Sequence, residues 1–368
     1  MAGSRGRRAA PDAALVEADD YPGRLWLRRA DQTTVDLPWL RRVRTRRQLA
    51  RATPVQCERP VASPGCESRW QPMDDRLPTD RSERPTGAAQ EGPLGSIVIP
   101  AFNEANVVER TLTHLFNGVD PSTLEVVVAC NGCTDATVEV AADSEVPVTV
   151  LDLPAVGKAG AIRAAEHEVR TLPRLYLDAD VRLDGTSAVA VLTALRDGAV
   201  AARPPLRYDT TGASWLVRRY YGQRVRLPDV HTDLCGAGVY GLSESARARF
   251  DDFPDLIADD LFAARVVEPS EVEIVACAPV SINVPRNVRS LVRTLARAHR
   301  GNRELFDRMP ELARSTTTST VRHLVRSMAV PAQFIDAAVY AAIVTFGRLL
   351  ASRRDSSWGR DETSRVTA

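Results

Sequence analysis

The sequence predicts an α/β protein with a mostly parallel sheet and helices on both faces. Two observations support this prediction. Short, continuous apolar runs alternate with amphipathic stretches from residue 95 onward, which is typical of parallel strands buried on both faces and joined by helices. Polar residues follow several of the apolar runs, at the sheet edge where such folds bind ligands.

The elements follow one another from residue 95. The apolar runs predict strands at 96–100, 124–129, 146–151 and 174–177, and the stretches between them predict helices at 104–116, 134–142 and 158–170. In the first of these helices Val108, Leu112 and Leu115 fall on one face, which predicts that this face packs on the sheet.

The ends of the chain differ from this central part. Residues 1–94 are rich in Arg and Pro, and we expect a low-order extension there, with a small hairpin-and-helix element within 23–49. We expect the main domain at 95–305, in two halves at 95–185 and 186–305, and a C-terminal helical segment at 306–368. Charged and polar residues interrupt the apolar run at 329–351, so a helix that packs or lies on a surface is expected there instead of a membrane span.

The composition excludes some classes of protein. Hydrophobic residues make up 44% of 368, enough for a large core, and 48 basic against 47 acidic residues give no signal for nucleic-acid binding. The first residues are basic without an apolar stretch, so we expect a cytoplasmic protein. Cys130 and Cys133 have C-x-x-C spacing, which fits either a redox pair or two small residues in a turn; Cys57 and Cys66 lack the spacing of a partner pair for zinc.

Two aspartates follow the last predicted strand. Asp178 and Asp180 come directly after the apolar run 175–177. Carboxylates this close repel each other, so a shared proton or a cation is the usual remedy. Oxygen ligands favour Mg²⁺ or Mn²⁺, ions that also bind substrate phosphates. The pair therefore predicts a metal site, with a loop or helix-cap role as the alternative.

Four short motifs occur in order along the predicted sheet: 99–104 (IPAFNE), 131–137 (NGCTDAT), 157–163 (GKAGAIR) and 178–180 (DAD). Together they resemble the V-P-x-[YF]-N-E, D-G-S-T-D-x-T, G-K-x-x-A-L-N and D-x-D motifs of family 2 glycosyltransferases. The resemblance covers about residues 95–306. It implies the Rossmann-like GT-A fold and transfer of a sugar from a nucleotide diphosphate. It also implies that 95–185 is the nucleotide-binding, or donor, half of the domain and 186–305 the acceptor half.

The resemblance also implies a donor site. The nucleotide would be bound by residues of all four motifs, namely Pro100, Ala101, Phe102, Glu104, Asn131, Lys158 and Asp178. Asp180 would bind Mn²⁺ or Mg²⁺ directly, and Asp178 would contact the ribose or a metal-bound water. Asn131 stands where most members carry an Asp that contacts the base of the nucleotide. With Asn at this position, the base could be guanine as well as uracil.

Some of these residues have alternative roles. Glu104 also suits the first turn of a helix, where the dipole favours a carboxylate. Lys158 opens a helix and suits a phosphate, or it is simply solvated. Asp135 suits a helix cap as well as a ligand contact. Arg163 replaces the family's Asn, and His231 is a lone histidine that fits a structural role or a further metal ligand.

The second half of the chain resembles the acceptor side of the family. A Gly-rich segment at 235–241 lacks the dinucleotide-binding pattern, and the resemblance places Gly236, Ala237 and Gly238 beside the donor and acceptor sugars.

An acidic pair follows in the segment 257–262 (IADDLF), where the resemblance puts Asp259 at the family's Glu position and Asp260 at the general base. An acceptor hydroxyl must lose its proton as it attacks the anomeric carbon, and one base opposite the leaving group implies inversion. The alternative is an acidic pair that stabilises a helix N-terminus.

Arginines recur at three- and four-residue spacing on a predicted helix, at 286, 289, 293, 297, 300 and 303. Arg297 and Arg300 are candidates for binding the diphosphate, and a basic face that meets anionic lipid or solvent is the alternative. The Q-x-x-R-W motif of processive family members is absent from the sequence, which argues against a processive synthase.

The main hypothesis is therefore a metal-dependent, inverting glycosyltransferase of bacterial polysaccharide, glycolipid or cell-envelope glycan synthesis. Its donor would be a UDP-sugar, with a GDP-sugar as the alternative, and its hydroxyl acceptor could be lipid-linked. We expect a cytoplasmic protein with peripheral contact at the inner face of the membrane and no nucleic-acid partner. A non-catalytic scaffold and a sugar-1-phosphate nucleotidyltransferase are the competing hypotheses.

Overall fold

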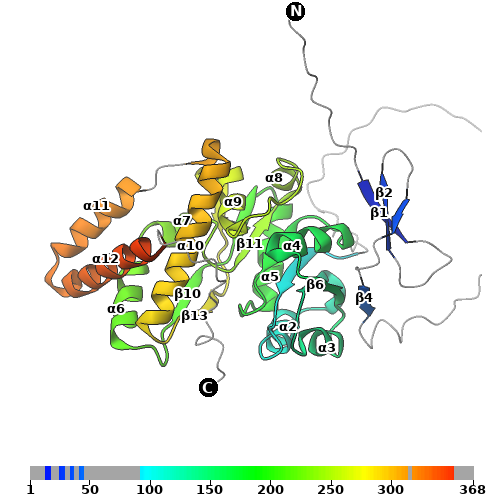
Figure 1. Ribbon diagram of the computed structural model, residues 1–368, viewed down its shortest axis with the longest axis horizontal. Coiled ribbons are helices and arrows are strands. Elements are labelled where there is room, and N and C mark those ends of the chain that lie inside the picture. The colour runs from blue at the N-terminus through cyan, green and yellow to red at the C-terminus, as the bar shows by residue number, and fades with distance from the viewer. Residues whose placement is uncertain are drawn as a thin grey trace, which may run out of the picture.

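The structure is a computed structural model that describes residues 92–313 and 317–351 and four short strands before them (Figure 1). These strands are β1 (Ala13–Glu17), β2 (Leu25–Arg29), β3 (Thr34–Asp36) and β4 (Arg41–Arg44). A hairpin-and-helix element was expected within 23–49, and β2 and β3 pair antiparallel there. Strand β1 adds to this pair as a third antiparallel strand, and β4 pairs with the main sheet. The helix expected near residue 49, Cys57 and Cys66 lie outside the described residues.

An eight-stranded sheet forms the centre, in the order β12-β9-β11-β8-β5-β6-β7-β4. Its strands after β4 are β5 (Gly95–Ala101), β6 (Leu124–Asn131), β7 (Thr149–Leu153), β8 (Arg174–Leu177), β9 (Ala201–Arg203), β11 (Val239–Leu242) and β12 (Val272–Ile274). Strands β5 to β8 are parallel, and β11 and β4 run antiparallel to their neighbours. β10 (Leu206–Asp209) and β13 (Val280–Asn283) form a separate parallel pair. The predicted α/β architecture is confirmed.

Helices cover both faces of this sheet. Along β5, Ile97 and Ile99 pack into one hydrophobic cluster and Val98 into another, as the alternation of a strand requires. The first cluster includes residues of α2 (Val108–Phe116), α3 (Thr137–Ala142) and α5 (Gly185–Arg196). The second includes residues of α4 (Gly157–Glu168), α8 (Glu244–Arg247) and α9 (Asp259–Val266).

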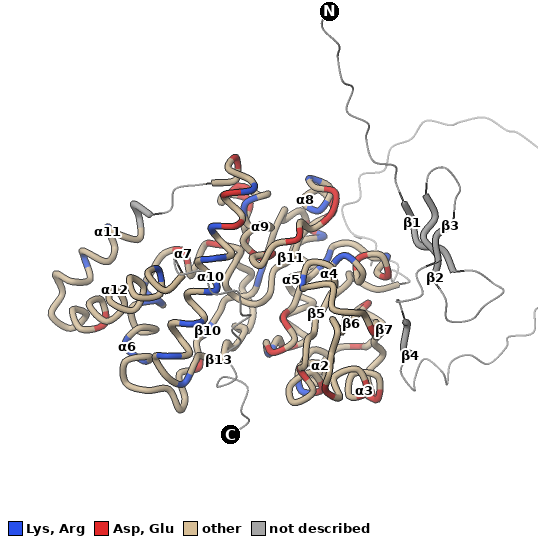
Figure 2. Tube along the Cα trace, viewed as in Figure 1, with Lys and Arg blue, Asp and Glu red and all other residues tan. Residues whose placement is uncertain are grey.

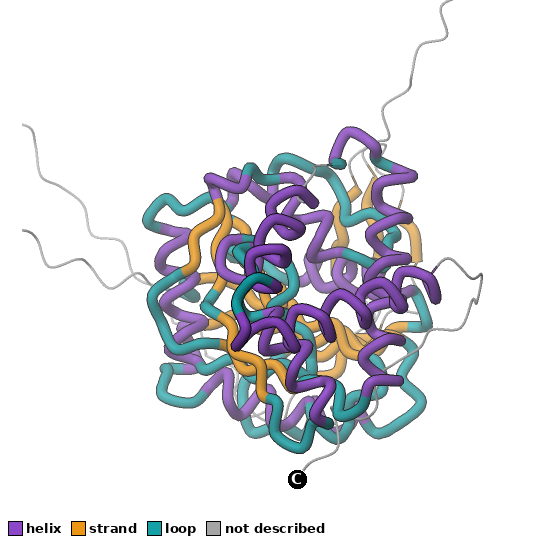
Figure 3. The backbone as a smooth tube through the Cα atoms, turned by 90° about the vertical axis from the view of Figure 1, so that its left-hand side faces the viewer, coloured by secondary structure: helices purple, strands orange, loops and turns teal. Residues whose placement is uncertain are grey.

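A third cluster lies at one end of the molecule and belongs to helices. It joins α6 (Trp215–Arg224), α7 (Asp229–Thr232), α10 (Val288–Arg308) and α12 (Pro331–Ala351), with α11 (Thr317–Met328) alongside. Figure 3 looks onto this end and shows helices in front of the strands. The boundary expected between residues 305 and 306 falls inside α10, which continues to Arg308 without a break.

Two helices begin later than their sequence pattern predicted. The carbonyl oxygen of Glu104 accepts hydrogen bonds from the amides of Val107 and Val108, so a turn precedes α2. Before α3, the Asp135 carboxylate accepts a 3.1 Å bond from the Thr137 amide. Asp135 therefore stabilises the turn before this helix, whose N-cap residue is Ala136 and has no side-chain cap bond.

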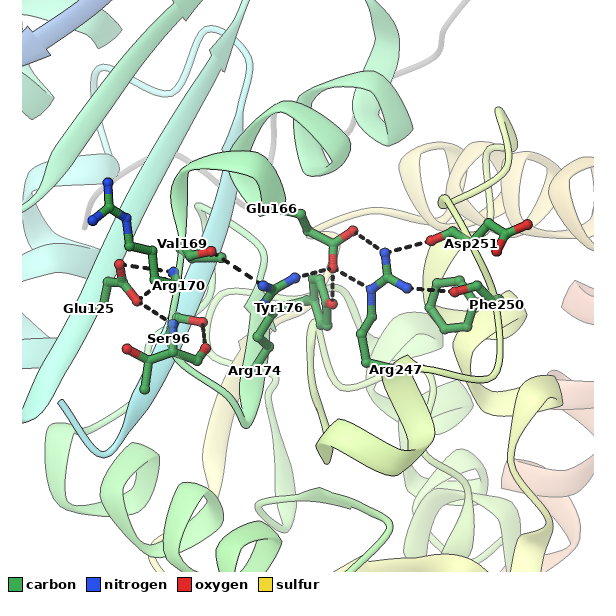
Figure 4. Close-up of polar contacts among 11 residues, drawn as sticks. Ser96, Glu125, Glu166, Val169, Arg170, Arg174, Tyr176, Arg247, Phe250 and Asp251 are labelled. Atoms are coloured by element: carbon green, nitrogen blue, oxygen red, sulfur yellow. Dashed lines mark hydrogen bonds and ion pairs between the residues drawn. The ribbon is translucent and has the colours of Figure 1, made fainter. Parts of the chain in front are cut away.

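A buried ionic network ties α4 to the sheet and to α8 (Figure 4). The Glu166 carboxylate accepts hydrogen bonds from the Tyr176 hydroxyl at 2.6 Å, from Arg174 at 3.0 Å and from Arg247 at 2.6 and 2.9 Å. Burial, and then the charge of Glu166, raises the pKa of Tyr176 well above its ordinary value. The network holds β8, and with it the turn that carries Asp178, against α4.

Candidate active site

A cavity of about 840 Å³ opens at the carboxyl ends of β5, β6 and β8 and is closed on the far side by α9 and α10. Almost all of the predicted site residues line it: Pro100, Ala101, Phe102, Glu104, Asn131, Lys158, Asp178, Asp180, Gly236, Asp259, Asp260, Arg297 and Arg300. The structure therefore brings together residues up to two hundred positions apart in the sequence.

The turns after β5 and β6 are fastened to each other. Asn103 has a positive φ of 53°, and its side-chain oxygen accepts a 2.8 Å bond from the Thr134 amide. The Glu104 amide donates to the Thr137 hydroxyl at 2.7 Å. These bonds fix the backbone of the first motif at the mouth of the cavity, where Glu104 is 7% exposed.

Asn131 ends β6 and has a second, structural contact. Its side-chain oxygen accepts a 2.8 Å bond from the amide of Val156, immediately before α4. The next residue, Gly132, has a φ of +59°, and a Cβ there would lie 2.8 Å from the backbone of Ala155. This turn therefore accepts only glycine without rearrangement, and it sets Asn131 against the loop that leads to Lys158.

The turn with the two aspartates is held from both sides. The Asp178 amide donates to the carbonyl oxygen of Gly238 at 2.9 Å, and the Thr111 hydroxyl donates to the carbonyl oxygen of Ala179 at 2.7 Å. Burial and the nearby Arg182 lower the pKa of Arg110, while Asp180 opposes this effect. Asp180 thus interacts electrostatically with Arg110 of α2.

Lys158 occupies the space between the two acidic motifs. Its Nζ lies 2.7 Å from Asp178 Oδ1 and 2.8 Å from Asp259 Oδ1. Burial lowers the pKa of Lys158, but the carboxylates of Asp178, Asp259 and Asp260 outweigh this effect and raise it above the ordinary value. The lysine that was predicted to face a phosphate therefore joins the turn after β8 to the start of α9 through two ion pairs.

Asp259 lies deeper than the sequence suggested. It is 3% exposed, and its Oδ2 accepts a 3.1 Å bond from the Tyr240 hydroxyl. Burial raises the pKa of Asp259, Lys158 opposes the shift and Asp260 adds to it. The contacts of Asp259 are thus with Tyr240 in the interior and with Lys158.

Asp260 is the outer member of the pair. Its Oδ2 accepts a 3.0 Å bond from the Gly236 amide, and its Oδ1 accepts a 2.8 Å bond from the Leu261 amide. Each carboxylate oxygen keeps a further lone pair, so Asp260 can still accept a proton. Its charge also contributes to raising the pKa of the partly buried Cys235 to about 12, desolvation being the larger cause.

Helix α10 forms the basic wall of the cavity. Arg297 and Arg300 line the cavity as predicted, and Arg308 lines it while pairing with Glu304 at 2.9 Å. Sequence reasoning missed several lining residues: Arg224, Asp255, Thr294, Asn302, Glu304 and Arg308. Helical spacing from Arg297 would have found Thr294 and Glu304, whereas Arg224 and Asp255 come from elements whose approach no local pattern indicates.

Other candidates lie away from the cavity. Ala237 is wholly buried in the first hydrophobic cluster. Gly238 supports Asp178 through its carbonyl oxygen, which accepts the bond from the Asp178 amide. A Cβ at Gly238 would lie 2.5 Å from the side chain of Val181. A ring nitrogen of His231 lies 2.7 Å from the carbonyl oxygen of Val225, which supports its structural role.

The remaining departures from the family pattern have structural partners. Arg163 donates to the carbonyl oxygen of Phe253 at 2.6 Å and so ties α4 to the loop before Asp259. Cys130 is a buried free thiol in β6, and the free thiol of Cys133 accepts a 3.4 Å bond from the Asn103 amide. The second interpretation of this pair, two small residues in a turn, fits these contacts.

The donor groups at the cavity fit a hard divalent ion that shares its ligands with a substrate. Within the described part of the chain, no three His, Cys, Asp or Glu side chains converge into a metal-binding group. Asp178 and Asp180 offer carboxylate oxygens at one turn, and Mg²⁺ sites commonly use one or two carboxylates together with substrate phosphates. The pair is therefore suited to an ion that arrives with a phosphorylated ligand.

The fold and the cavity together define a nucleotide-binding type of α/β domain with an acidic centre and a basic wall. Residues 96–250 match the model of glycosyl transferase family 2. This part of the chain is therefore a family 2 glycosyltransferase domain, as its four motifs predicted.

The individual relatives are more distant. A glycosyltransferase from Haloferax volcanii, AglD, is 30% identical over 152 residues, which is 39% of this chain and 23% of the relative. The chain thus spans about a quarter of the length of that curated protein.

Two solved structures are similar to this one. A mannosyltransferase from Pyrobaculum calidifontis, in complex with GDP-Man and Mn²⁺, is 18% identical, covers 71% of this chain and 74% of its own, and has a TM-score of 0.46. Glucosyl-3-phosphoglycerate synthase from Mycobacterium tuberculosis, in complex with Mn²⁺ and UDP, is 19% identical, covers 61% and 85%, and has a TM-score of 0.41.

Proposed function

We propose that this chain is a metal-dependent, inverting glycosyltransferase that moves a sugar from a nucleotide diphosphate to a hydroxyl acceptor. The observation that carries the proposal is the meeting of three groups in one cavity: the Asp178–Asp180 turn, the carboxylate of Asp260 and the arginines of α10. They supply an ion site, a base and a wall of positive charge.

The donor half would bind the nucleotide. The backbone of Pro100 to Phe102, with Glu104 and Asn131, would contact the base and ribose, and Asp178 would contact the ribose or a water on the ion. Asp180 would bind Mn²⁺, or Mg²⁺ in its place. The bound ion would act as a Lewis acid and neutralise charge on the departing diphosphate.

Lys158 and the α10 arginines would complete the phosphate site. Lys158 is now held by two carboxylates at 2.7 and 2.8 Å. A cation at Asp178 would compete with Lys158 for the same oxygen, which would release the ammonium group toward an incoming phosphate. Arg297 and Arg300 line the opposite wall and would share the remaining negative charge.

The acceptor half would activate the attacking hydroxyl. Asp260 is fixed by two amide hydrogen bonds, so its free lone pairs have a set direction. It would take the proton of the acceptor hydroxyl as that oxygen bonds to the anomeric carbon and the bond from this carbon to the diphosphate breaks. The configuration at the anomeric carbon would be inverted. Asp259, which is adjacent to Asp260 in the chain, would hold this general base in place together with Lys158.

The biological setting that we propose is the synthesis of a bacterial polysaccharide, glycolipid or cell-envelope glycan. A UDP-sugar is the favoured donor and a GDP-sugar the alternative, because Asn131 can both donate and accept hydrogen bonds. The proposed compartment is the cytoplasm, with a lipid-linked acceptor at the inner face of the membrane.

The test is a thermal-shift panel of UDP, GDP, CDP and TDP, each with Mn²⁺ and with EDTA. We expect one nucleotide to raise the melting temperature only with the metal, since binding to the folded state alone stabilises it. The variant Asp180→Asn should lose the metal-dependent shift. Asp143→Asn, an exposed aspartate at the end of α3, is the control and should keep it.

No shift with any nucleotide in the unaltered protein would contradict the proposal and favour a non-catalytic scaffold. A metal-dependent shift that survives Asp180→Asn would remove Asp180 from the ion site.

A further inference from the structure

Two C-terminal helices leave an apolar surface exposed. The side chains of Val321, Val325, Val330, Phe334, Ile335, Phe346 and Leu349 are between 41% and 61% exposed. We call these seven residues of α11, α12 and the turn between them the C-terminal apolar face. Large apolar side chains gathered in this way mark an interaction surface more often than free solvent.

The face follows the geometry of α12. Its exposed residues Ile335, Ala342, Phe346 and Leu349 recur at helical spacing. The opposite side of the same helix is buried against α6 and α10 through Asp336, Ala337, Tyr340, Ile343 and Gly347. Helix α12 is thus fixed to the protein on one side and open on the other.

The contacts of α12 with the rest of the protein show whether this helix could span a membrane or would lie on its surface. Among the described residues, α12 alone is long and apolar enough to cross a bilayer by length and composition. However, Asp336 is 4% exposed and pairs with Arg226 at 2.8 Å and Arg219 at 3.3 Å, both near α6. Crossing a bilayer would separate this carboxylate from its partners or carry three charges into hydrocarbon, which is costly.

The exposed charges of α11 and α12 have one sign. Helix α11 contains Arg322, His323 and Arg326 and no acidic residue, and both arginines are exposed. In α12 the exposed charge is Arg348, because the acidic residue of that helix is the buried Asp336. Figure 2 shows both helices tan over most of their length, so charged residues are few in them.

We propose that the C-terminal apolar face lies on a bilayer with anionic headgroups, with Phe346 and Leu349 in the interface and Arg322 and Arg326 on lipid phosphates. Amphipathic helices bind membranes in this way, through buried apolar area and attraction to anionic lipid. A symmetric dimer through this face fits less well, since it would set the same arginines against each other without acidic partners. The inference rests on the membrane setting of the proposed function and deepens it by naming the surface and the charge of the lipid.

The experiment is co-sedimentation of the full chain with vesicles of phosphatidylcholine alone or mixed with phosphatidylglycerol. We expect binding to the anionic vesicles that weakens as salt is added. The variant Arg322→Glu/Arg326→Glu should lower the affinity about tenfold or more, since each arginine near the surface contributes. Phe346→Ser/Leu349→Ser should lower it by a similar factor through lost apolar burial.

A matched control changes the charge equally elsewhere. Arg170→Glu/Arg196→Glu alters exposed arginines after α4 and at the end of α5, in the half of the molecule away from α11 and α12 (Figure 1). It should bind anionic vesicles like the unaltered protein. Melting curves of all variants establish that each is folded.

Three results would overturn the inference: no sedimentation with anionic vesicles, equal binding to neutral vesicles, or loss of binding in the control as large as in Arg322→Glu/Arg326→Glu. A dimer that Phe346→Ser/Leu349→Ser dissociates, together with no vesicle binding, would assign the face to a second copy. Changes of the melting temperature on addition of nucleotide, measured on the same samples, separate the two proposals. Vesicle binding without any such change would contradict the glycosyltransferase function and would still support the membrane surface.

Discussion

Asp260 and Asp259 are adjacent in the sequence, yet the structure gives them different environments. Asp259 is buried and bonded to Tyr240 and Lys158, while Asp260 lies at the cavity with two amide donors. The sequence could nominate both as an acidic pair at a helix start. Only the packing of β11 and α4 against α9 decides which of them is buried.

The first prediction concerns Asp260. Asp260→Asn removes the general base, so we expect turnover to fall about 10²-fold or more, with the Mn²⁺-dependent nucleotide shift unchanged. Steady-state turnover with donor and acceptor, beside the thermal shift, measures both. Asp255→Asn, which removes a carboxylate from the same cavity, serves as the control and should retain most activity. Unchanged turnover in Asp260→Asn would exclude it as the base.

The second prediction concerns Lys158. Lys158→Met leaves the buried Asp259 without its cationic partner, which we expect to lower the free energy of unfolding by about 3 kcal/mol. The pKa of Asp259 is already raised by burial, and the loss of Lys158 raises it further. A raised carboxyl pKa means that protonation favours the folded state, so the deficit should be small below pH about 3.9 and should grow as pH rises.

Urea denaturation of the unaltered protein and of Lys158→Met, between about pH 3.5 and about pH 7.5, measures whether the deficit in unfolding free energy grows with pH. This range begins near the ordinary pKa of an Asp carboxyl. A deficit that is constant over the range, or that shrinks as pH rises, would show that the Lys158–Asp259 contact is not what stabilises the fold. Lys158→Arg restores a cation and should recover part of the loss.

At the scale of the element, the Glu166 network explains why the turn after β8 is well placed. One carboxylate joins α4, β8 and α8, and the side chains of Glu166, Arg174 and Arg247 are 6%, 13% and 16% exposed. Ion pairs this deeply buried become costly when one partner is removed, because the other charge stays buried.

The third prediction follows from this burial. Glu166→Gln keeps the shape of the side chain but leaves Arg174 and Arg247 without an anion, so we expect a loss of about 3–5 kcal/mol in the free energy of unfolding. The surface pair Arg249–Glu271, 34% and 28% exposed, supplies the comparison: Glu271→Gln should cost under about 1 kcal/mol. Chemical denaturation measures both, and similar losses in the two variants would refute the assignment.

The elements also show where local patterns mislead. The strand at 174–177 was predicted with its observed ends, because a short apolar run between turns has one interpretation. The helix expected from 104 begins at Val108, because contacts from the neighbouring motif hold Glu104 in a turn. Side-chain caps that come from residues thirty positions away are not visible in a local pattern.

At the scale of the whole molecule, the C-terminal helices complete a core. The third cluster includes Val217 and Tyr220 of α6, Leu291 of α10, and Tyr340 and Ile343 of α12. The rings of Tyr220 and Tyr340 stack with centroids 5.0 Å apart. Helix α12 therefore serves two surfaces, one packed on the protein and one exposed.

The last prediction tests the packed surface. A chain that ends at residue 313 would expose the α6 and α10 side of this cluster, so we expect aggregation or a much lower melting temperature, since large apolar area would lose its cover. Phe346→Ser/Leu349→Ser changes side chains that are 60% and 61% exposed and should leave the melting temperature nearly unchanged. A truncated chain that melts like the full one would show that α12 adds nothing to the core.

The class of the fold, the four motifs and the acidic pair could be predicted from the sequence, because strand and helix periods and short motifs are local properties of the chain. Other features of the site and of the helices came only with the three-dimensional packing. It bridged Asp178 to Asp259 through Lys158, buried Ala237, brought Arg224 and Asp255 to the cavity and gave α12 one covered and one open side. Each of these depends on which distant segments pack together, and packing of that kind leaves no trace in the spacing of neighbouring residues.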